Sequence, residues 1–364
     1  MNFLKAVGDF FRLNTEEEHV YTGRELRKRV EKGKLDIEIY YEKPDDRLKS
    51  RIHSFFHKGM VKSILTEYEI GDMRNPTPIK NRGQQCFMIA AVQACFACPP
   101  ITQFIKDNVV PEEEECAFNG KLDRKMKKLL AKYLIGYPCT EVTSGFELFM
   151  EFSEGHPHDS EEYFSSINDK YFSKAMPIPI EARTWTCATC NRVQFMEPQG
   201  ASLFLPSMPA NPDEELNMAA FISHKEGLEV EPRTCIFCGL YGEGSVTTSY
   251  KFSNMISVYA HTDERVAKFE EFVDLSSLEP SVEYSHWKLA GVVFYRKELE
   301  EKNSHYVAVV KMGEKHYLMN DSKVSIVDSP IDYRFLSRHH GRPQYALYYR
   351  ENWQEMLAPG AQRQ

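Results

Sequence analysis

Residues 81–88, Asn-Arg-Gly-Gln-Gln-Cys-Phe-Met, run directly into the apolar stretch 89–96. A polar turn that contains glycine therefore delivers one cysteine, Cys86, to the start of a predicted helix. The first N–H groups of a helix lack partners within the helix, and with the helix dipole they favour a thiolate there. Cys86 is thus a candidate nucleophile. The alternative for a single cysteine in an apolar helix is a buried structural residue.

The composition describes an ordinary globular protein with room for a large core and for two or three domains or one elaborate domain. The chain has 364 residues, of which 42% are hydrophobic and 27% charged. Its net charge of −8 argues against a broadly nucleic-acid-binding surface. No stretch approaches the roughly 18 consecutive apolar residues of a transmembrane helix, and residues 1–13 lack a signal-peptide core. We therefore expect an intracellular protein, cytoplasmic or nuclear, with no membrane partner.

The pattern of residues divides the chain into an N-terminal appendage, a main domain and a short tail. Residues 1–75 combine a charge-dense segment with an amphipathic helical pattern at 48–65, so we interpret them as an appendage. The main domain spans 76–355, and we expect 356–364 to be frayed. Helical patterns dominate from 86 to 176, and β-rich runs follow from 177 onward. Helices followed by antiparallel strands predict an α+β fold. The clearest strands are predicted at 289–295, 306–311, 316–319 and 345–349.

Two Cys-x-x-Cys pairs form a candidate metal site. Cys187 and Cys190 make the first pair, and Cys235 and Cys238 make the second. Each two-residue spacing directs both thiolates at one ion, and two such knuckles complete a tetrahedral zinc site. Gly239 suits the tight turn that such a knuckle needs. Because four thiolates leave no open position, we predict a structural zinc that ties together the ends of long strands; the alternative is four unliganded thiols.

A third pair, Cys95 and Cys98, lies on the predicted helix that begins at Cys86. Residues three apart share one face of a helix, so this pair can be core packing or an alternative pair of ligands. Apolar neighbours and the following Pro99-Pro100 favour core packing.

A third signal lies near the C-terminal end. His305 begins a strand-like run, a hairpin-like turn follows at 312–314, and Asn320 and Asp321 end the next strand. His305 and Asn320 can therefore lie side by side on adjacent antiparallel strands. An Asn or Asp there can bond one imidazole nitrogen and direct the other at a thiol. Taken alone, His305 is more simply a satisfied core or surface histidine.

The three signals occur in a specific order. Asn-x-Gly-x-x-Cys-Phe-Met at 81–88 precedes the split cysteine knuckles, and His-Tyr at 305–306 precedes Tyr-x-x-Asn-Asp-Ser-x-Val at 317–324. Together they resemble the ubiquitin-specific protease family of deubiquitinating cysteine proteases. The resemblance covers roughly residues 78–350 and ends on the predicted strand 345–350.

The resemblance implies a role for each motif residue. Cys86 would attack the carbonyl of the scissile bond, and His305 would take its proton and later protonate the leaving amine. Asn320 would orient the imidazole, with Asp321 as an alternative orienter or a supporting group. Asn81 would stabilise the oxyanion together with the backbone N–H of Cys86.

The resemblance also implies a fold and a partner. The fold would be a papain-like hand with a helical thumb at about 80–176, zinc-tipped β fingers at about 177–250 and an antiparallel β palm at about 250–355. The fingers would grip ubiquitin, and the substrates would be ubiquitinated proteins. The chain departs from the family pattern at Gln84-Gln85, Ser304 and His316, where the family usually has Asn-Thr, Gly and Trp. These departures indicate a divergent member.

Two other functions remain open from the sequence. One is a catalytically weak or inactive ubiquitin-binding protein, which would have the same hand-like fold but hydrolyse its substrate slowly or not at all. The intact Cys86, His305 and Asn320 argue against it. A zinc-ribbon nucleic-acid binder is disfavoured by the acidic balance and by the lack of a Lys/Arg cluster around Cys187 or Cys235.

Overall fold

The computed structural model describes residues 58–68, 76–110, 118–134, 140–141, 152, 158–173, 176–205, 216–227, 229–260, 266–282, 285–297 and 304–356. Most of the predicted appendage 1–75 and the tail after residue 356 lie outside these residues. The predicted amphipathic helix at 48–65 overlaps the described helix α4 (Lys58–Glu67).

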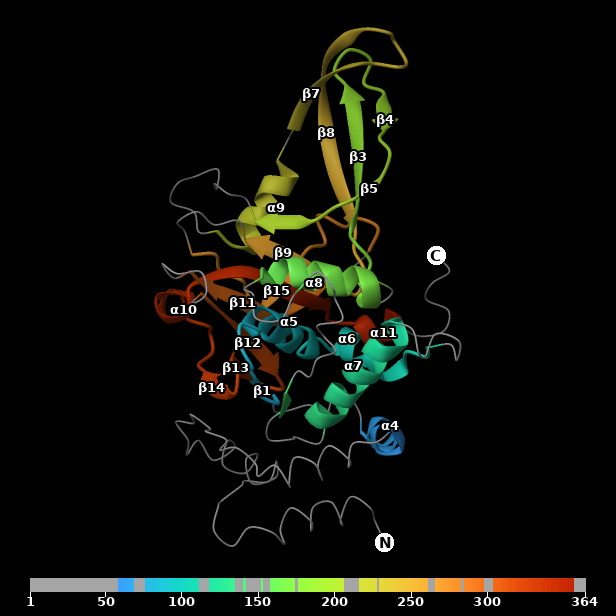
Figure 1. The fold of residues 1–364 in the computed structure, drawn as a ribbon. Coiled ribbons are helices and arrows are strands. Elements are labelled where there is room, and N and C mark those ends of the chain that lie inside the picture. The colour runs from blue at the N-terminus through green and yellow to red at the C-terminus, as the bar shows by residue number, and fades with distance from the viewer. Residues whose placement is uncertain are drawn as a thin grey trace, which may run out of the picture.

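The helices predicted between residues 86 and 176 are present in the described part of the chain and pack together on one side of the molecule (Figure 1). Helix α5 (Cys86–Phe96) is buried along its whole length, as expected for a helix that is apolar all round. Pro99 occupies the first turn of α6, and the chain bends by 88° between α5 and α6. The other elements of this group are α6 (Pro99–Asp107), α7 (Phe118–Leu134), α8 (Ser160–Ile167) and the π-helical turn η3 (Asn168–Phe172).

A large sheet follows in the chain and forms the centre of the molecule (Figure 1). Within the described residues it has eight strands in the order β14-β13-β12-β11-β15-β9-β6, with β10 also paired to β11. The four β-rich runs predicted from the sequence correspond to β11, β12, β13 and β15. The strands are β6 (Leu203–Leu205), β9 (Met255–Ala260), β10 (Phe272–Asp274), β11 (His286–Arg296), β12 (His305–Met312), β13 (Lys315–Asn320), β14 (Lys323–Val327) and β15 (Arg342–Arg350).

Both faces of the large sheet are covered, which explains why its central strands are almost continuously apolar. Along β12, Ala308 and Val310 belong to the core between α5 and the large sheet, whereas Val307 and Val309 belong to the core on the opposite face of the sheet. That second core includes residues of α9 (Met218–Glu226) and α10 (Tyr333–His340). The sheet is thus sandwiched between the α5 group and these two helices.

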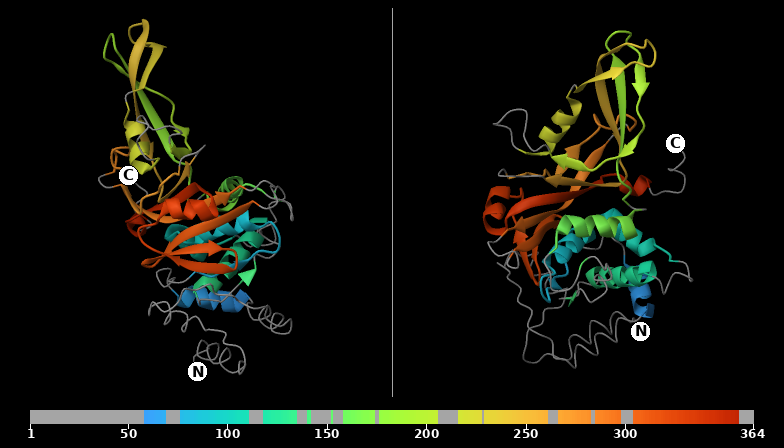
Figure 2. Two further views of the ribbon diagram at one scale, coloured as in Figure 1. Left: turned by 90° about the vertical axis from the view of Figure 1, so that its left-hand side faces the viewer. Right: turned by 45° about the horizontal axis from the view of Figure 1, so that its top comes forward.

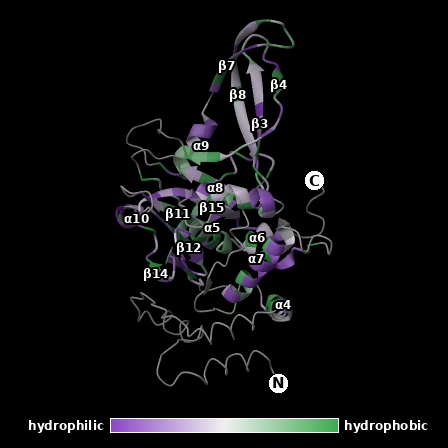
Figure 3. Cartoon of the chain, in the orientation of Figure 1, coloured by the Kyte–Doolittle hydropathy of each residue, from purple (hydrophilic) through white to green (hydrophobic). Residues whose placement is uncertain are grey.

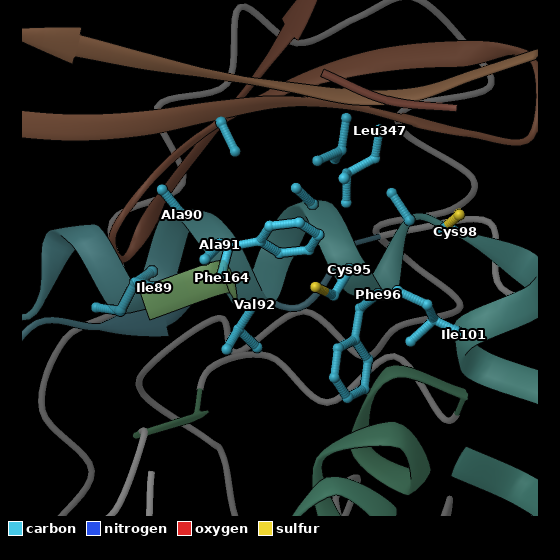
Figure 4. Packing of buried hydrophobic residues seen from close by; sticks show 14 of the residues in the cluster. Ile89, Ala90, Ala91, Val92, Cys95, Phe96, Cys98, Ile101, Phe164 and Leu347 are labelled. Atoms are coloured by element: carbon cyan, nitrogen blue, oxygen red, sulfur yellow. The ribbon is translucent and has the colours of Figure 1, made fainter. Parts of the chain in front are cut away.

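Helix α5 approaches the sheet very closely because small residues line the contact. A Cβ atom added at Gly291 of β11 would lie 3.6 Å from the Cα atom of Ala94. Figure 4 shows Ala90, Ala91 and Cys95 on α5, with Leu347 of β15 above the helix. This contact places the first residue of α5 beside the large sheet.

A second, smaller sheet projects away from the rest of the molecule (Figure 2). Within the described residues it has five strands, in the order β4-β3-β8-β7 with β5 paired to β3. Ile236 and Phe237, in the loop between β7 and β8, are exposed apolar residues. Figure 3 shows hydrophobic colouring at the far end of this sheet. The strands are β3 (Ile180–Cys187), β4 (Val193–Phe195), β5 (Gln199–Gly200), β7 (Glu229–Thr234) and β8 (Tyr241–Lys251).

Two short strands and one short helix complete the described elements. Strands β1 (Ile79–Lys80) and β2 (Thr140–Glu141) form a parallel pair, and α11 (Trp353–Met356) follows β15. In the parts of the chain that the structure describes, no single helix is long and apolar enough to cross a membrane; the bent pair α5 and α6 meets that test on length and composition alone.

Candidate active site and candidate metal centre

Cys86 is the first residue of α5, as the sequence predicted, and a strained turn places it there. Gly83 and Gln84 have positive φ angles of 128° and 52°, which is the left-handed region that glycine tolerates and glutamine rarely adopts. The side-chain oxygen Oδ1 of Asn81 accepts hydrogen bonds from the backbone N–H groups of Gly83 (2.9 Å) and Gln85 (3.2 Å). Asn81 therefore closes the turn that presents the thiol of Cys86.

His305 and Asn320 meet on the predicted hairpin. His305 begins β12, Asn320 ends β13, and the connecting turn contains Gly313 with a φ of 59°. The Nε2 atom of His305 lies 2.8 Å from Oδ1 of Asn320. Because the amide oxygen can only accept, Nε2 carries the proton of this hydrogen bond. The other nitrogen, Nδ1, is left to face a reacting group.

Cys86 is the second partner of the His305 side chain. The side chains of His305 and Cys86 form a hydrogen bond, which brings the end of α5 and the start of β12 into one site. This bond, aided by Asn320 and by the charge of Asp321 against the effect of burial, raises the pKa of His305 from 6.5 to about 9. An imidazole with this pKa is protonated at neutral pH, which suits a thiolate–imidazolium pair. Cys86 is 8% exposed, so its thiol is largely shielded from water, whereas the side chain of His305 is 25% exposed.

Asp321 lies next to this pair, but its hydrogen-bond partner is Asn81 and not His305. Its Oδ2 atom is 4.0 Å from Nε2 of His305, beyond hydrogen-bond distance, and accepts a hydrogen bond of 3.1 Å from Nδ2 of Asn81. Burial raises the pKa of the Asp321 carboxyl group, although His305 and Asn81 oppose the shift. Of the two candidate orienters, Asn320 holds the imidazole and Asp321 holds Asn81.

Residues of α8 that the sequence analysis did not identify also reach the site. Asp159 caps the start of α8, and its other oxygen, Oδ2, accepts a 3.3 Å hydrogen bond from the hydroxyl group of Tyr306, which follows His305. The hydroxyl group of Ser160 donates to the carbonyl oxygen of Phe87, which follows Cys86 (2.9 Å). An Asp before a helical pattern is a recognisable cap signal, but its position beside the candidate nucleophile comes from the fold.

The start of α8 also carries a group of carboxylates. Burial, together with the charges of Asp159 and Glu162, raises the pKa of Glu161 to about 7. The start of α8 is therefore acidic, although Glu161 is only partly ionised at neutral pH.

The four predicted metal ligands also come together, at the far end of the small sheet. The Sγ atoms of Cys187, Cys190, Cys235 and Cys238 all lie within 4.8 Å of one another. Two of these separations are 4.0 Å (Cys187 to Cys238) and 3.6 Å (Cys190 to Cys235). Sulfur atoms that share a tetrahedral zinc ion at about 2.3 Å lie about 3.8 Å apart, so this set fits zinc.

The two knuckles have the same backbone form. Asn191 follows the first pair with a φ of 54°, and Gly239 follows the second with a φ of 72°. In each knuckle the N–H of that residue donates to the carbonyl oxygen of the first cysteine at 2.9 Å. The turn predicted at Gly239 is confirmed; the equivalent turn at Asn191 was not predicted, although asparagine is the residue that most often replaces glycine there.

The pair Cys95 and Cys98 does not join this centre. Both side chains are buried in the core beneath the large sheet, and burial raises the pKa of each thiol. The interpretation of these two cysteines as core residues is therefore confirmed.

Comparisons with known proteins place the fold but not a sequence family. No family model matches the chain. No curated protein matches it either. Among solved structures, the chain is similar to the SAGA DUB module of Ubp8, Sgf11, Sus1 and Sgf73 bound to monoubiquitin, in which Ubp8 carries a cysteine-to-alanine change. The TM-score is 0.55 at 13% identity, over 85% of this chain and 76% of that chain. The predicted mixed α and β fold is confirmed at this level.

Proposed function

We propose that this chain is a cysteine-type deubiquitinase that hydrolyses the isopeptide or peptide bond after the C-terminal glycine of ubiquitin. The observation that carries the proposal is the set of Cys86, His305 and Asn320, which meet from two distant parts of the chain in the geometry of a thiol protease. The fold adds support, because the similar SAGA module binds monoubiquitin.

The chemistry follows from the two nitrogens of His305. Nδ1 accepts the thiol proton of Cys86 while Nε2 stays bonded to Asn320, and the thiolate attacks the carbonyl carbon of the terminal glycine. The protonated imidazole then donates this proton to the leaving amine as the C–N bond breaks. Water hydrolyses the resulting thioester by the reverse proton transfers and restores the thiol.

Asn81 and the backbone N–H of Cys86 would stabilise the oxyanion that forms during attack. The Asn81 amide group carries two N–H bonds, and Asp321 accepts one of them. The second N–H is the donor that the oxyanion requires. Asp321 thereby fixes the direction of that donor.

The layers of the fold suggest how ubiquitin would be held. Residues of about 80–176 would form the thumb, the small sheet at about 177–250 the fingers, and the large sheet at about 250–355 the palm. The carboxylates of Asp159, Glu161 and Glu162 would face a cationic segment of the bound protein beside the scissile bond. Conjugated proteins would then be the substrates.

The cysteine cluster would hold a structural zinc ion. Four thiolates fill a tetrahedral site completely, so the metal would link β3 to the loop between β7 and β8 and take no part in hydrolysis. The backbone N–H of Cys190 lowers the pKa of the Cys187 thiol, which helps the ligand to deprotonate.

The decisive experiment is reaction with ubiquitin that carries an electrophilic C-terminus. We expect the wild-type chain to form a covalent adduct through Cys86, detected by intact mass and peptide mapping. The Cys86→Ala variant should form none. The matched control is Cys95→Ala, which removes a buried thiol from the same helix.

Folded wild-type protein that binds ubiquitin without forming the adduct would contradict the proposal and support an inactive ubiquitin-binding protein. Parallel reactions with related modifiers would define which modifier is preferred.

A further inference from the structure

The segment of residues 76–81, hereafter the strap, connects the two halves of the candidate active site. At one end, the carbonyl oxygen of Thr77 accepts a 3.0 Å hydrogen bond from Nε2 of Gln93 on α5. Further along, the N–H of Ile79 donates to the carbonyl oxygen of Asp321 (3.1 Å), and Asn81 ends the strap against the same residue. The strap is thus bonded to the helix of the nucleophile and to the strands of the histidine.

Gln93 is held in a single orientation. Its side chain is fully buried, and its Oε1 atom accepts a hydrogen bond from the hydroxyl group of Tyr133 on α7. Tyr133 is 1% exposed, and burial raises the pKa of its phenol, so it remains a donor at neutral pH. Because Oε1 accepts from Tyr133, the amide N–H groups of Gln93 must point at Thr77.

The position of Gln93 on α5 explains what this bond does. Gln93 follows Cys86 by seven positions, or about two helical turns, so both residues lie on one side of the helix. The hydrogen bond to Thr77 therefore closes a ring of chain that contains Asn81 and Cys86. A buried amide in an otherwise apolar helix is costly unless its bonds are made, and these bonds are to the strap and to Tyr133.

We infer that Gln93, oriented by Tyr133, is a positioning residue that fixes Asn81 relative to Cys86 by holding the strap. The inference rests on the proposed function, because it assigns Gln93 an effect on the oxyanion donor of that reaction. Gln93 itself touches no reacting atom. Its loss leaves the thiol and the imidazole in place and loosens the amide that stabilises the transition state.

A double-mutant cycle on hydrolysis of a ubiquitin C-terminal fluorogenic amide tests this inference. Asn81→Ala is expected to lower kcat by at least about 10²-fold, because it removes one oxyanion donor and also the acceptor that closes the turn before Cys86. Gln93→Leu is expected to lower kcat about 10-fold with KM unchanged, because a misplaced donor costs only transition-state binding. In the Asn81→Ala background, Gln93→Leu should cost less than about twofold, since its target is already absent.

Two further variants separate positioning from general loss of structure. Tyr133→Phe removes one oxygen atom from the same network and should show the same dependence on Asn81. Asn168→Leu is the matched control, because Asn168 is a buried amide whose Nδ2 donates to the carbonyl oxygen of Met176 (3.3 Å) away from the strap. Its effect on kcat should be the same with and without Asn81. Thermal unfolding of each variant reports stability separately.

Each outcome decides one point. If the wild type is active and the losses in kcat from Gln93→Leu and Asn81→Ala multiply in the double variant, the inference is overturned. The proposed function then stays intact. The inference is also overturned if the loss in kcat from Asn168→Leu depends on Asn81 as strongly as the loss from Gln93→Leu does. A folded wild type with no hydrolysis and no adduct overturns the proposed function, and the inference falls with it.

Discussion

His305 lies between a thiol and an amide oxygen, and each neighbour determines one of its properties. Asn320 fixes which nitrogen carries a proton, because its oxygen accepts from Nε2. Cys86 supplies the largest contribution to the raised pKa. The same two contacts therefore set the direction and the charge of the imidazole.

The first prediction concerns the charge of His305. In the wild type its imidazole should titrate near pH 9, as followed by NMR of the labelled ring. In Cys86→Ala the pKa should fall toward 6.5, because the largest cause of the shift is removed. Amide hydrolysis by the wild type should decline above pH 9, where the imidazole no longer holds the proton for the leaving amine.

The sign of the linked effect on stability follows from the raised pKa. Charged His305 stabilises the folded state fully below pH 6.5, and this contribution is lost as the pH rises through about 9. An unchanged His305 titration in Cys86→Ala would contradict the assigned contact.

The second prediction separates Asn320 from Asp321. Asn320→Ala should lower kcat at least about 10²-fold, because the imidazole loses the partner that holds its ring. Asp321→Asn keeps a carbonyl oxygen that can accept from Asn81, so its loss should stay within about 10-fold. Steady-state hydrolysis of the ubiquitin amide measures both. A larger loss in Asp321→Asn than in Asn320→Ala would make Asp321 the orienter.

Among the elements, the small sheet depends on one tryptophan. Trp185 of β3 is fully buried, and its Nε1 donates to the carbonyl oxygen of Glu231 on β7 (2.9 Å). Its ring covers Gly244 of β8 and belongs to the same small core as Cys187 and Cys235. The cysteine cluster therefore lies on a packed base of its own, separate from the two large cores.

The third prediction compares two glycines on β8. A Cβ atom at Gly244 would clash with the Trp185 ring and with backbone, so Gly244→Ala should lower the unfolding free energy by about 1–3 kcal/mol. Gly242→Ala should change it by less than about 0.5 kcal/mol, because nothing lies within 4 Å of the added atom. Denaturant unfolding of both variants measures the difference. Equal effects would contradict the packing described for Trp185.

The fourth prediction concerns the metal. Purified chain should contain one zinc ion per molecule, and Cys238→Ser should lose it, as measured by elemental analysis. A chelator should increase hydrogen exchange in β3, β7 and β8 while β11, β12 and β15 remain protected, because the large sheet has its own cores. Full metal content in Cys238→Ser would exclude this four-cysteine site.

The sequence predicted the elements whose pattern is strong and local. The strands β11, β12, β13 and β15 contain β-rich runs, and Cys86, His305 and Asn320 belong to recognisable motifs. The three-residue strand β6 and the helix α9 were not predicted. Strand β6 is too short to give a pattern of its own and is defined by its pairing with β9. Asp159 and Gln93 were missed for the same reason. Their partners, Tyr306 and Thr77, are adjacent only after the sheet and the helices have packed.

At the scale of the whole molecule, one buried ion pair joins the end of the large sheet to the base of the small sheet. Arg350 ends β15 and bonds Glu279 at 2.7 Å, and each of these two side chains is 1% exposed. Arg350 also donates to the carbonyl oxygens of Phe252 and Ser253, which follow β8. Its guanidinium group lies over the ring of Trp287, 4.6 Å from the centroid.

The fifth prediction uses this pair. Arg350→Met should lower the unfolding free energy by about 3–5 kcal/mol, because the carboxylate of Glu279 is left buried without a counter-charge. The double variant with Glu279→Leu should recover much of that loss. The exposed contact between Arg183 and Glu229 is the control, since Glu229→Gln should cost less than about 1 kcal/mol. Equal losses from the two pairs would contradict the role given to burial.

The position of β15 within the large sheet has a consequence for the newly made protein. β15 is among the last described elements of the chain, yet it lies between β11 and β9 in the middle of the sheet. While the chain is being synthesised, Cys86 emerges long before the strand that completes the sheet around His305. A growing chain therefore carries a thiol without its histidine partner in place. If the proposed function holds, reactivity toward ubiquitin should therefore arise only after Arg342–Arg350, which pair with β11, have emerged.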